Sequence, residues 1–184
     1  MTVTFSAPRL ETERLILRAP EIGDQDVHAA FFMSERAKFV GGPTTAERAW
    51  RLLALEVGHW VLRGFGRWAL EEKATGKFVG IVGNYHPVGF PEDELGWDLF
   101  DGATGKGYAT EAALAARAYA YDTLGWTTLT SMIDPANTAS AAVATRLGAA
   151  YDYDFTHEHF GPVQIWRHPG PDTAQRPTYY RSLP

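Results

Sequence analysis

The segment Asp101-Gly102-Ala103-Thr104-Gly105-Lys106-Gly107-Tyr108-Ala109-Thr110-Glu111 joins a strand-like alternating run to a run of small, helix-forming residues. The glycines at 105 and 107 let the backbone turn where other residues would be strained. A helix that starts near Gly107 leaves the N–H groups of its first turn unpaired, and its dipole adds partial positive charge there. The segment therefore predicts an anion site suited to a phosphate or pyrophosphate group.

Two common phosphate-binding motifs do not fit this segment. A P-loop needs glycine where Phe100 stands, and serine or threonine where Gly107 follows Lys106. A dinucleotide-binding fingerprint needs Gly or Ala where Thr110 stands, and an acidic residue about 20 positions later, where residues 127–130 carry none. The segment therefore represents another kind of phosphate loop.

The hydrophobic pattern on both sides of this segment predicts one α+β domain with a mixed sheet. Strands are expected over residues 14–18, 67–72, 78–85, 94–100, 127–133, 149–159 and 163–167. Helices are expected over residues 24–33, 44–57, 107–124 and 137–147. Their N-caps are expected at Asp24, at Thr44 or Thr45, and at Asn137 or Thr138, with Gly125 as a C-cap. Residues 1–168 are expected to form the domain, and residues 169–184 a Pro-rich C-terminal tail.

Composition excludes several classes of protein. The chain has 184 residues, a net charge of −5 and no cysteine. It therefore has no disulfide framework, thiolate metal site or cysteine nucleophile. The acidic balance argues against a nucleic-acid partner, because such proteins usually carry a basic face. We find no signal peptide and no membrane-spanning run, so a cytoplasmic protein without a membrane partner is expected.

Four phrases, in order along the chain, resemble the GCN5-related N-acetyltransferase (GNAT) family and its RimJ/RimL-like branch. Thr104-Gly105-Lys106-Gly107-Tyr108-Ala109 resembles motif A, whose usual form is Gln/Arg-x-x-Gly-x-Gly/Ala. The other phrases are Leu10 to Arg18, similar to the opening strand, Glu94-Leu95-Gly96-Trp97, similar to strand four, and Asn137 to Ser140 with Arg146 to Ala149, similar to motif B. The resemblance covers roughly residues 9–167. It implies a mixed, mostly antiparallel central sheet flanked by helices, with strands four and five splayed around acyl-CoA.

The resemblance implies that acetyl-CoA is the cosubstrate. The residues that it assigns to acetyl-CoA binding are Leu99, Phe100, Thr104, Gly105, Lys106, Gly107, Tyr108, Ala109, Thr110, Asn137, Ser140 and Arg146. Thr104 replaces the usual Gln or Arg, but backbone N–H groups do most of the pyrophosphate binding, so we expect binding to survive. No metal is expected, because His157 and His159 share one strand face without a third ligand nearby.

The implied reaction is direct transfer of an acetyl group to a primary amine in a ternary complex. The family's strand-four base maps onto Glu94, and Asp98 is the second candidate because strand alternation places it on the same face. Either carboxylate would take the proton from the amine, directly or through a water. The resemblance assigns stabilisation of the oxyanion to a backbone N–H at Leu99 or Phe100.

The general acid of the family is missing at its usual place. A Tyr commonly stands seven residues after the motif B Asn, where this chain has Ala144. Ser140 is the best replacement, since it lies one helical turn from Asn137. A thiolate is also a good leaving group, with a pKa of about 8.5, so the reaction can proceed without a dedicated acid.

The acceptor is expected to be a protein N-terminal α-amine or a small-molecule amine. The acidic balance favours a cationic acceptor that approaches Glu94 or Asp98, and Tyr85, Phe90 and Trp97 are candidates to line its slot. The alternative is a non-catalytic acyl-CoA-binding module of the same fold, because fold alone does not determine function. The choice between a monomer and a homodimer stays open.

Overall fold

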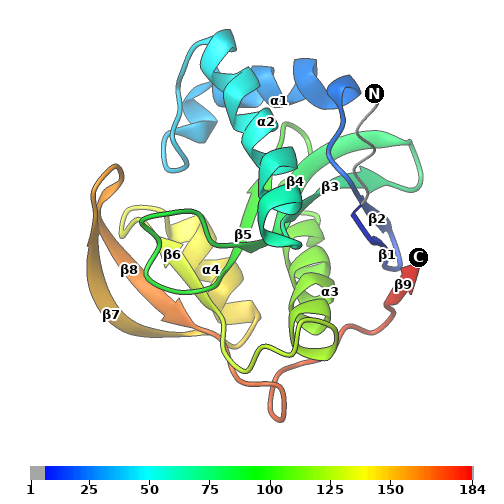
Figure 1. Ribbon diagram of the computed structural model, residues 1–184, viewed down its shortest axis with the longest axis vertical. Helices are drawn as coiled ribbons and strands as arrows, with labels where there is room; N and C mark the ends of the chain where they lie inside the picture. Colours follow the sequence, from blue (N-terminus) through cyan, green and yellow to red (C-terminus); the bar gives the residue numbers. More distant parts are fainter. Residues whose placement is uncertain (1–6, 184) are drawn as a thin grey trace.

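A nine-stranded sheet runs through the molecule in the order β7-β8-β6-β5-β4-β3-β2-β1-β9 (Figure 1). The computed structural model describes residues 7–183. The strands are β1 (Arg9–Glu11), β2 (Leu15–Arg18), β3 (Arg67–Glu72), β4 (Lys77–Tyr85), β5 (Glu94–Leu99), β6 (Thr130–Ile133), β7 (Ala150–His157), β8 (Gly161–Arg167) and β9 (Arg181–Leu183). All the paired strands are antiparallel except β5 and β6, which are parallel. The predicted α+β fold with a mixed, mostly antiparallel sheet is confirmed.

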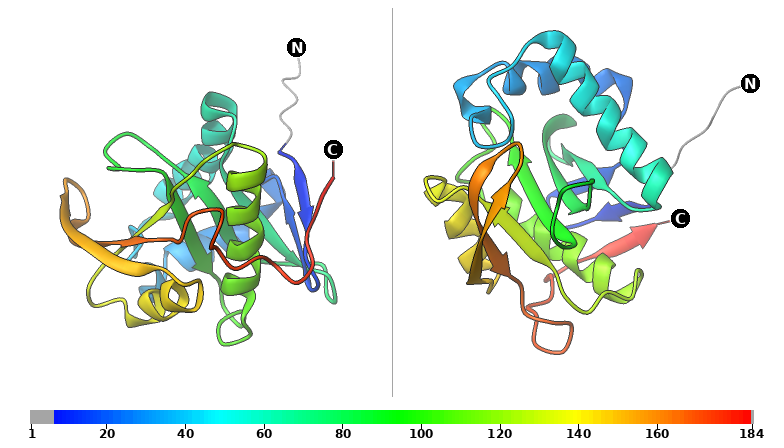
Figure 2. Two further views of the ribbon diagram at one scale, coloured as in Figure 1. Left: turned by 90° about the horizontal axis from the view of Figure 1, so that it is seen from below. Right: turned by 60° about the vertical axis from the view of Figure 1, so that its left-hand side comes forward.

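Four α-helices flank this sheet in the described part of the chain. They are α1 (Gln25–Phe32), α2 (Ala46–Arg63), α3 (Tyr108–Asp122) and α4 (Thr138–Arg146). Helices α1 and α2 lie together at one end of the molecule, whereas α3 packs along β4 and β5 (Figure 2). Nearly every residue of α3 is buried, and its many alanines let the helix approach the sheet closely.

Two of the predicted N-caps are confirmed and one is wrong. The Thr45 hydroxyl accepts a hydrogen bond from the N–H of Arg48, and the Asn137 side chain caps α4. Asp24 does not cap α1. Its carboxylate instead accepts hydrogen bonds from Arg18, at 2.6 and 2.9 Å, and from the N–H of Glu21. An ion pair with a half-buried guanidinium outweighs a cap, because a charged partner makes the stronger hydrogen bond.

Several predicted ends differ from the observed ones. Helix α3 ends at Asp122, so Gly125 is not its C-cap. Strand β6 begins at Thr130, where it first meets both β5 and β8. The β7–β8 hairpin pairs His157 with Gly161, which leaves residues 158–160 for the turn. His159 therefore lies in this turn rather than on a strand face shared with His157.

The segment expected to be a tail, residues 169–184, packs along the body over its described part. The Tyr121 hydroxyl donates to the carbonyl of Pro169 at 2.8 Å, and Arg117 donates to the carbonyl of Gln175 at 2.9 Å. Strand β9 then pairs with β1 at the sheet edge. Within residues 7–183, no helix has the length and apolar character that crossing a membrane requires. The division into a domain and a tail stays a prediction.

Substitution by alanine should have opposite effects on stability at two glycines. A Cβ on Gly58, inside α2, would meet nothing within 4 Å beyond its own helix, whereas a Cβ on Gly80, in β4, would collide with the carbonyl oxygen of Asp98. Gly58→Ala should therefore raise the free energy of unfolding by about 1 kcal/mol, through helix propensity. Gly80→Ala should lower it, because the collision involves backbone. Urea titration measures both, and an unchanged midpoint for Gly80→Ala would contradict the β4–β5 register.

Candidate active site

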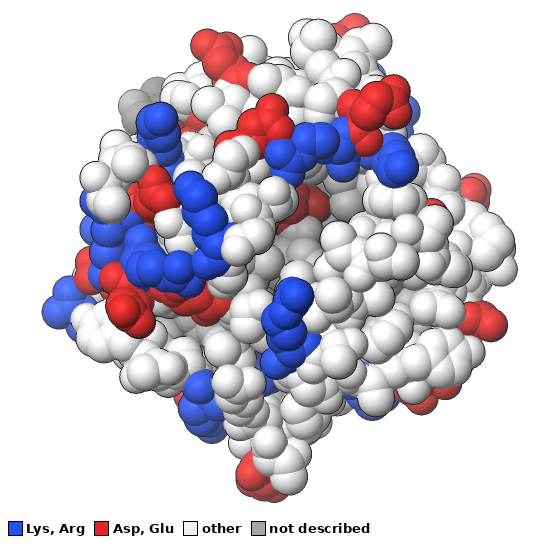
Figure 3. All heavy atoms as spheres, turned by 180° about the vertical axis from the view of Figure 1, so that it is seen from behind, with Lys and Arg blue, Asp and Glu red and all other residues white. Residues whose placement is uncertain are grey.

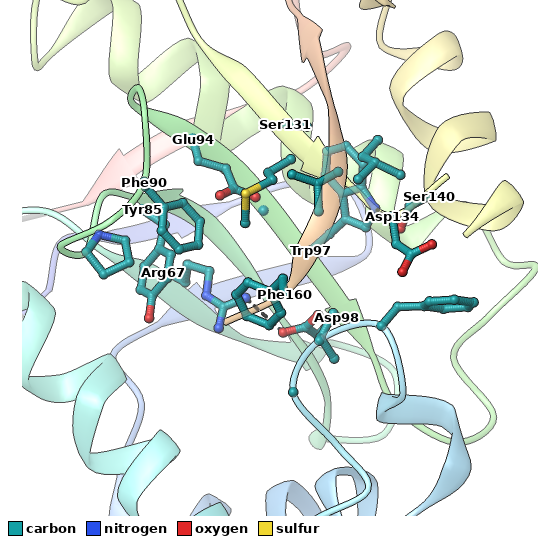
Figure 4. A pocket seen from close by; sticks show the side chains of 18 of the residues that line it. Arg67, Tyr85, Phe90, Glu94, Trp97, Asp98, Ser131, Asp134, Ser140 and Phe160 are labelled. Carbon is teal, nitrogen blue, oxygen red and sulfur yellow. Dashed lines mark hydrogen bonds and ion pairs between the residues drawn. The ribbon is translucent and has the colours of Figure 1, made fainter. Parts of the chain in front are cut away.

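The parallel strands β5 and β6 part after one residue pair. Glu94 pairs with Thr130, and the next contact is a hydrogen bond from the Ser131 hydroxyl to the carbonyl of Leu95, at 2.6 Å. A cavity of about 300 Å³ opens where the strands diverge. It is closed on its other sides by the α1–α2 region, the β4–β5 loop and the β7–β8 turn (Figure 4). The family's strands four and five correspond to β5 and β6 in this chain. Their predicted splay is thus confirmed, and it produces a cavity.

Glu94 lies in the cavity wall and forms no ion pair among the described residues. Its side chain is buried, and its Oε2 atom has no hydrogen-bond partner among residues 7–183. Burial raises the pKa of Glu94 to about 8, although the charge of Arg67 and a hydrogen bond from the backbone N–H of Met132 act in the opposite direction. Because this carboxyl group titrates near neutral pH and one of its oxygens has no partner, it can accept a proton from a bound molecule.

Asp98 shares this face of β5 but is held in an ion pair. Arg67 donates from Nη1 to Asp98 at 2.8 Å, and it also binds both carboxylate oxygens of Glu56. A Cβ on Gly96 would lie 3.6 Å from Glu94 Oε1, so the predicted common face is confirmed. The structure nevertheless separates the two candidate bases, since Asp98 forms an ion pair and Glu94 forms none among the described residues.

The two predicted oxyanion donors point in opposite directions. The N–H of Phe100 donates to the carbonyl of Val79 at 3.0 Å. Alternate residues of an antiparallel strand direct their N–H groups to opposite sides, so those of Leu99 and Trp97 point away from β4. That side is the one from which β6 has parted. The N–H of Leu99 therefore points toward the side of β6, although Leu99 is not among the residues that line the cavity, whereas the N–H of Phe100 is already used in the sheet.

Asn137 and Ser140 line the end of the cavity next to α4. The Ser140 hydroxyl accepts a hydrogen bond from the indole N–H of Trp97 at 3.3 Å. Figure 4 shows Ser140 and Asp134 on one side of the cavity, and Tyr85, Phe90 and Arg67 on the other. The structure thus brings the predicted acid and the predicted base to the same cavity.

A buried chain of hydrogen bonds stabilises the point where β5 and β6 diverge. The sequence did not predict this chain. Arg117 lies 3.3 Å from Nδ1 of His168, and Nε2 of His168 lies 3.0 Å from the Ser131 hydroxyl, which donates to Leu95. Arg117 can only donate, so the proton of the ring is on Nε2. Burial lowers the pKa of His168 to about 3, so the ring is neutral. The one signal for this chain in the sequence is a lone Arg within the alanine run of α3.

The predicted pyrophosphate loop lies outside the cavity lining, at the start of α3. Gly107 is the N-cap of α3, with a φ of 81°, and no side chain caps the helix. The N–H groups of Tyr108, Ala109 and Thr110 therefore lack partners within the helix. Gly105 has a φ of 78°, and the side chains of Thr104 and Lys106 are exposed beside these amides.

The opening strand holds this loop through Arg14. The Arg14 side chain donates to the carbonyl of Lys106 at 2.8 Å and forms an ion pair with Glu111 at 2.7 Å. Glu111 also accepts from the Thr12 hydroxyl at 2.6 Å. Two of the phrases that carry the family resemblance are therefore in direct contact with each other.

Cations gather locally despite the negative net charge. Figure 3 shows one face of the molecule with Lys and Arg side chains on either side of a hollow. Arg146, the last residue of α4, is exposed and has no ion pair among the residues that the structure describes. It remains available to an anionic ligand, whereas Lys106, whose side chain is half exposed, already forms a 3.8 Å ion pair with Glu72.

The two histidines considered as metal ligands have protein partners. Nδ1 of His157 accepts from the N–H groups of His159 and Phe160, at 3.1 and 3.2 Å. Nε2 of His159 lies 3.1 Å from the guanidinium of Arg48. Across residues 7–183, no group of three His, Asp or Glu side chains is arranged to hold a metal ion.

Comparisons with known proteins agree with this geometry. Residues 14–150 match the model of the acetyltransferase (GNAT) domain. The crystal structure of the acetyltransferase from Agrobacterium tumefaciens str. C58 is 37% identical, with a TM-score of 0.82, over 91% of this chain and 98% of that one. The uncharacterized N-acetyltransferase YoaA of Bacillus subtilis (strain 168) is 26% identical over 77% of this chain and 82% of its own length.

A third relative matches only in part. YkkB of Bacillus subtilis (strain 168) is 34% identical over 48% of this chain, and the match spans about half, 52%, of its length. The domain match covers well over half of the chain. The chain therefore belongs to the acetyltransferase (GNAT) family, and the predicted N-acetyltransferase is confirmed at the level of the family.

The pKa of Glu94 predicts a specific dependence of stability on pH. The folded protein holds this proton up to about pH 8, whereas the unfolded chain releases it near pH 4.5. The stability that the folded state gains by binding this proton is therefore lost as the pH rises from 4.5 to 8. Glu94→Gln removes the titration. The free energy of unfolding of this variant should therefore rise relative to that of the wild type as the pH increases across this range.

Urea unfolding of both proteins at several pH values measures this gain. Glu13→Gln, at an exposed carboxylate without an ion pair among the described residues, is the matched control and should run parallel to the wild type. A constant difference between Glu94→Gln and the wild type across the range would show that the Glu94 pKa is not raised.

Proposed function

We propose that this protein transfers an acetyl group from acetyl-CoA to a primary amine by direct attack in a ternary complex. The observation that carries the proposal is the buried Glu94 carboxyl group, whose Oε2 atom has no hydrogen-bond partner among the described residues, in a cavity formed by two parting strands. Membership of the GNAT family supports the reaction type. The uncapped amides of α3 support a pyrophosphate site at Tyr108, Ala109 and Thr110.

In the proposed reaction, the amine nitrogen attacks the thioester carbonyl carbon. A C–N bond forms, the C–S bond breaks and Glu94 receives the proton that the amine loses. The N–H of Leu99, which points toward the side of β6, would stabilise the oxyanion. Ser140 accepts a hydrogen bond from Trp97, so its own O–H can donate a hydrogen bond to the departing sulfur, which leaves as the CoA thiolate while the amine proton stays on Glu94. No cysteine is present to form an acyl-enzyme.

For the acceptor we propose a chemical class, and for the location a cellular compartment. The RimJ/RimL-like phrases favour a protein N-terminal α-amine or a small-molecule amine. Walls of the cavity come from residues 32–56, 85–90 and 159–163, which fall in the regions without a recognisable motif. A cytoplasmic location is proposed from the cysteine-free composition, and the choice between monomer and homodimer stays open.

Replacing the proposed base tests the mechanism. With acetyl-CoA and an accepted amine, kcat/KM of the wild type should rise with pH and level off above about 8, where Glu94 is ionised. Glu94→Gln should lower kcat/KM by about 100-fold, the lower end of what a general base contributes, and remove that inflection. Release of CoA thiol measures the rate, with Glu13→Gln as the control. A Glu94→Gln profile that keeps the inflection would exclude Glu94 as the base.

Arg14 provides a separate test of the cosubstrate site. Arg14→Met removes the bonds that hold Lys106 and Glu111, so the dissociation constant for acetyl-CoA should rise by about 10-fold, for the loss of charge-assisted hydrogen bonds. Isothermal titration measures this, and Arg9→Met, on the neighbouring strand β1, is the control. Unchanged affinity would show that the loop does not depend on Arg14. A wild-type protein that binds no acetyl-CoA at millimolar concentration would overturn the proposed function.

A further inference from the structure

The acceptor side of the cavity is walled mainly by aromatic and aliphatic groups. Tyr85 and Phe90 pack edge to face, with ring centroids 5.6 Å apart, and Phe160 lies 6.5 Å from Phe90. The other apolar members of this wall are Phe32, Phe39, Val40, Leu52, Leu55, Pro87 and Val163. A cavity of about 300 Å³ with such a lining suits a small ligand with an apolar body.

Most carboxylates in the cavity wall are already engaged. Glu56 and Asp98 both bind Arg67, which is itself buried and lies over the ring of Tyr85 at 4.7 Å. Asp134, at the α4 end, accepts a hydrogen bond from the N–H of Ala136. Glu94 is thus the one acidic side chain of the acceptor side that no cation holds among the described residues. A single ammonium group can be received there, and the other carboxylate without an ion pair among the described residues, Asp134, lies at the α4 end of the cavity.

Two cations of the cavity wall lack acidic partners. Lys38 follows the 3₁₀ turn after α1, and Arg48 lies in the first turn of α2. Neither forms an ion pair with a carboxylate within residues 7–183. Lys38 lies over the ring of Phe39, and Arg48 contacts His159, whose Nε2 must then be an acceptor. These contacts place positive charge on the α1–α2 side of the cavity without neutralising it.

We propose that the acceptor is a small primary amine with an aromatic or branched apolar body and a carboxylate, bound with its amine toward Glu94 and its carboxylate toward Lys38 and Arg48. This inference rests on the proposed function, whose acceptor it specifies. It replaces the expectation from net charge of a cationic acceptor. The distribution of partners within the cavity, rather than the total of −5, decides what charge the ligand carries.

A panel of four amines tests the proposal, with kcat/KM measured through release of CoA thiol. L-phenylalanine carries all three features, phenethylamine lacks the carboxylate, and spermidine has several ammonium groups and no apolar ring. L-phenylalaninamide lacks the carboxylate but loses its amine proton more readily than phenylalanine. It therefore separates recognition of the carboxylate from simple availability of the free amine.

We expect kcat/KM for phenylalanine to exceed that for each of the other three by about 10-fold or more, from charge-assisted hydrogen bonds to its carboxylate. In the double variant Lys38→Gln/Arg48→Gln, the preference over phenylalaninamide should disappear through a higher KM. Arg63→Gln, at the exposed end of α2 outside the cavity lining, should keep the preference. Titration with acetyl-CoA should give equal affinity for all of these proteins.

The outcomes separate this inference from the function on which it rests. Equal rates for phenylalanine, its amide and phenethylamine, or a preference for spermidine or for phenylalaninamide, would overturn the inference while leaving acetyl transfer intact. Acetyl-CoA binding without acetylation of phenylalanine would overturn it as well. Absence of acetyl-CoA binding in the wild type would overturn the proposed function itself.

Discussion

The hydrogen bond from the Ser131 hydroxyl to the Leu95 carbonyl stands where a backbone bond between β5 and β6 would otherwise form. Beyond it the two strands diverge, and the side chain of Glu94 faces a cavity. His168 contacts that hydroxyl, and Arg117 contacts His168 in turn. The point of divergence is therefore stabilised within the core, since Ser131, His168 and Arg117 each have hydrogen-bond partners.

The same burial that holds the parted strands sets the chemistry of the cavity. In a region of low dielectric constant, a carboxyl group without an ion pair keeps its proton, and this raises the pKa of Glu94 to about 8. Burial also raises the pKa of Asp98, but Arg67 holds that carboxylate in an ion pair. Two carboxylates four residues apart on one strand thus acquire different properties. One becomes part of a fixed ion-pair network, and the other is left free to exchange a proton.

Local pattern predicted the mixed sheet, most of its strands and the four α-helices, because alternation, helical periodicity and glycine preferences act within a few residues. Local pattern failed to predict the roles of residues whose ion-pair or strand partners lie elsewhere in the chain. Asp24 appeared to be a cap but pairs with Arg18, and β1 and β9 are three-residue strands that exist only because they pair at the sheet edge. Such pairings produce no periodic pattern of residues in the sequence.

For the site, the sequence by itself determined the glycine-dependent start of α3, the common face of Glu94 and Asp98, and the family to which the chain belongs. The tertiary structure alone decided which carboxylate is free, which backbone N–H points toward the side of β6, and which cations line the cavity. The physical reason is that a side chain's charge state and availability depend on burial and on partners. Arg67, Ser131 and His168 acquire their roles only when distant strands meet.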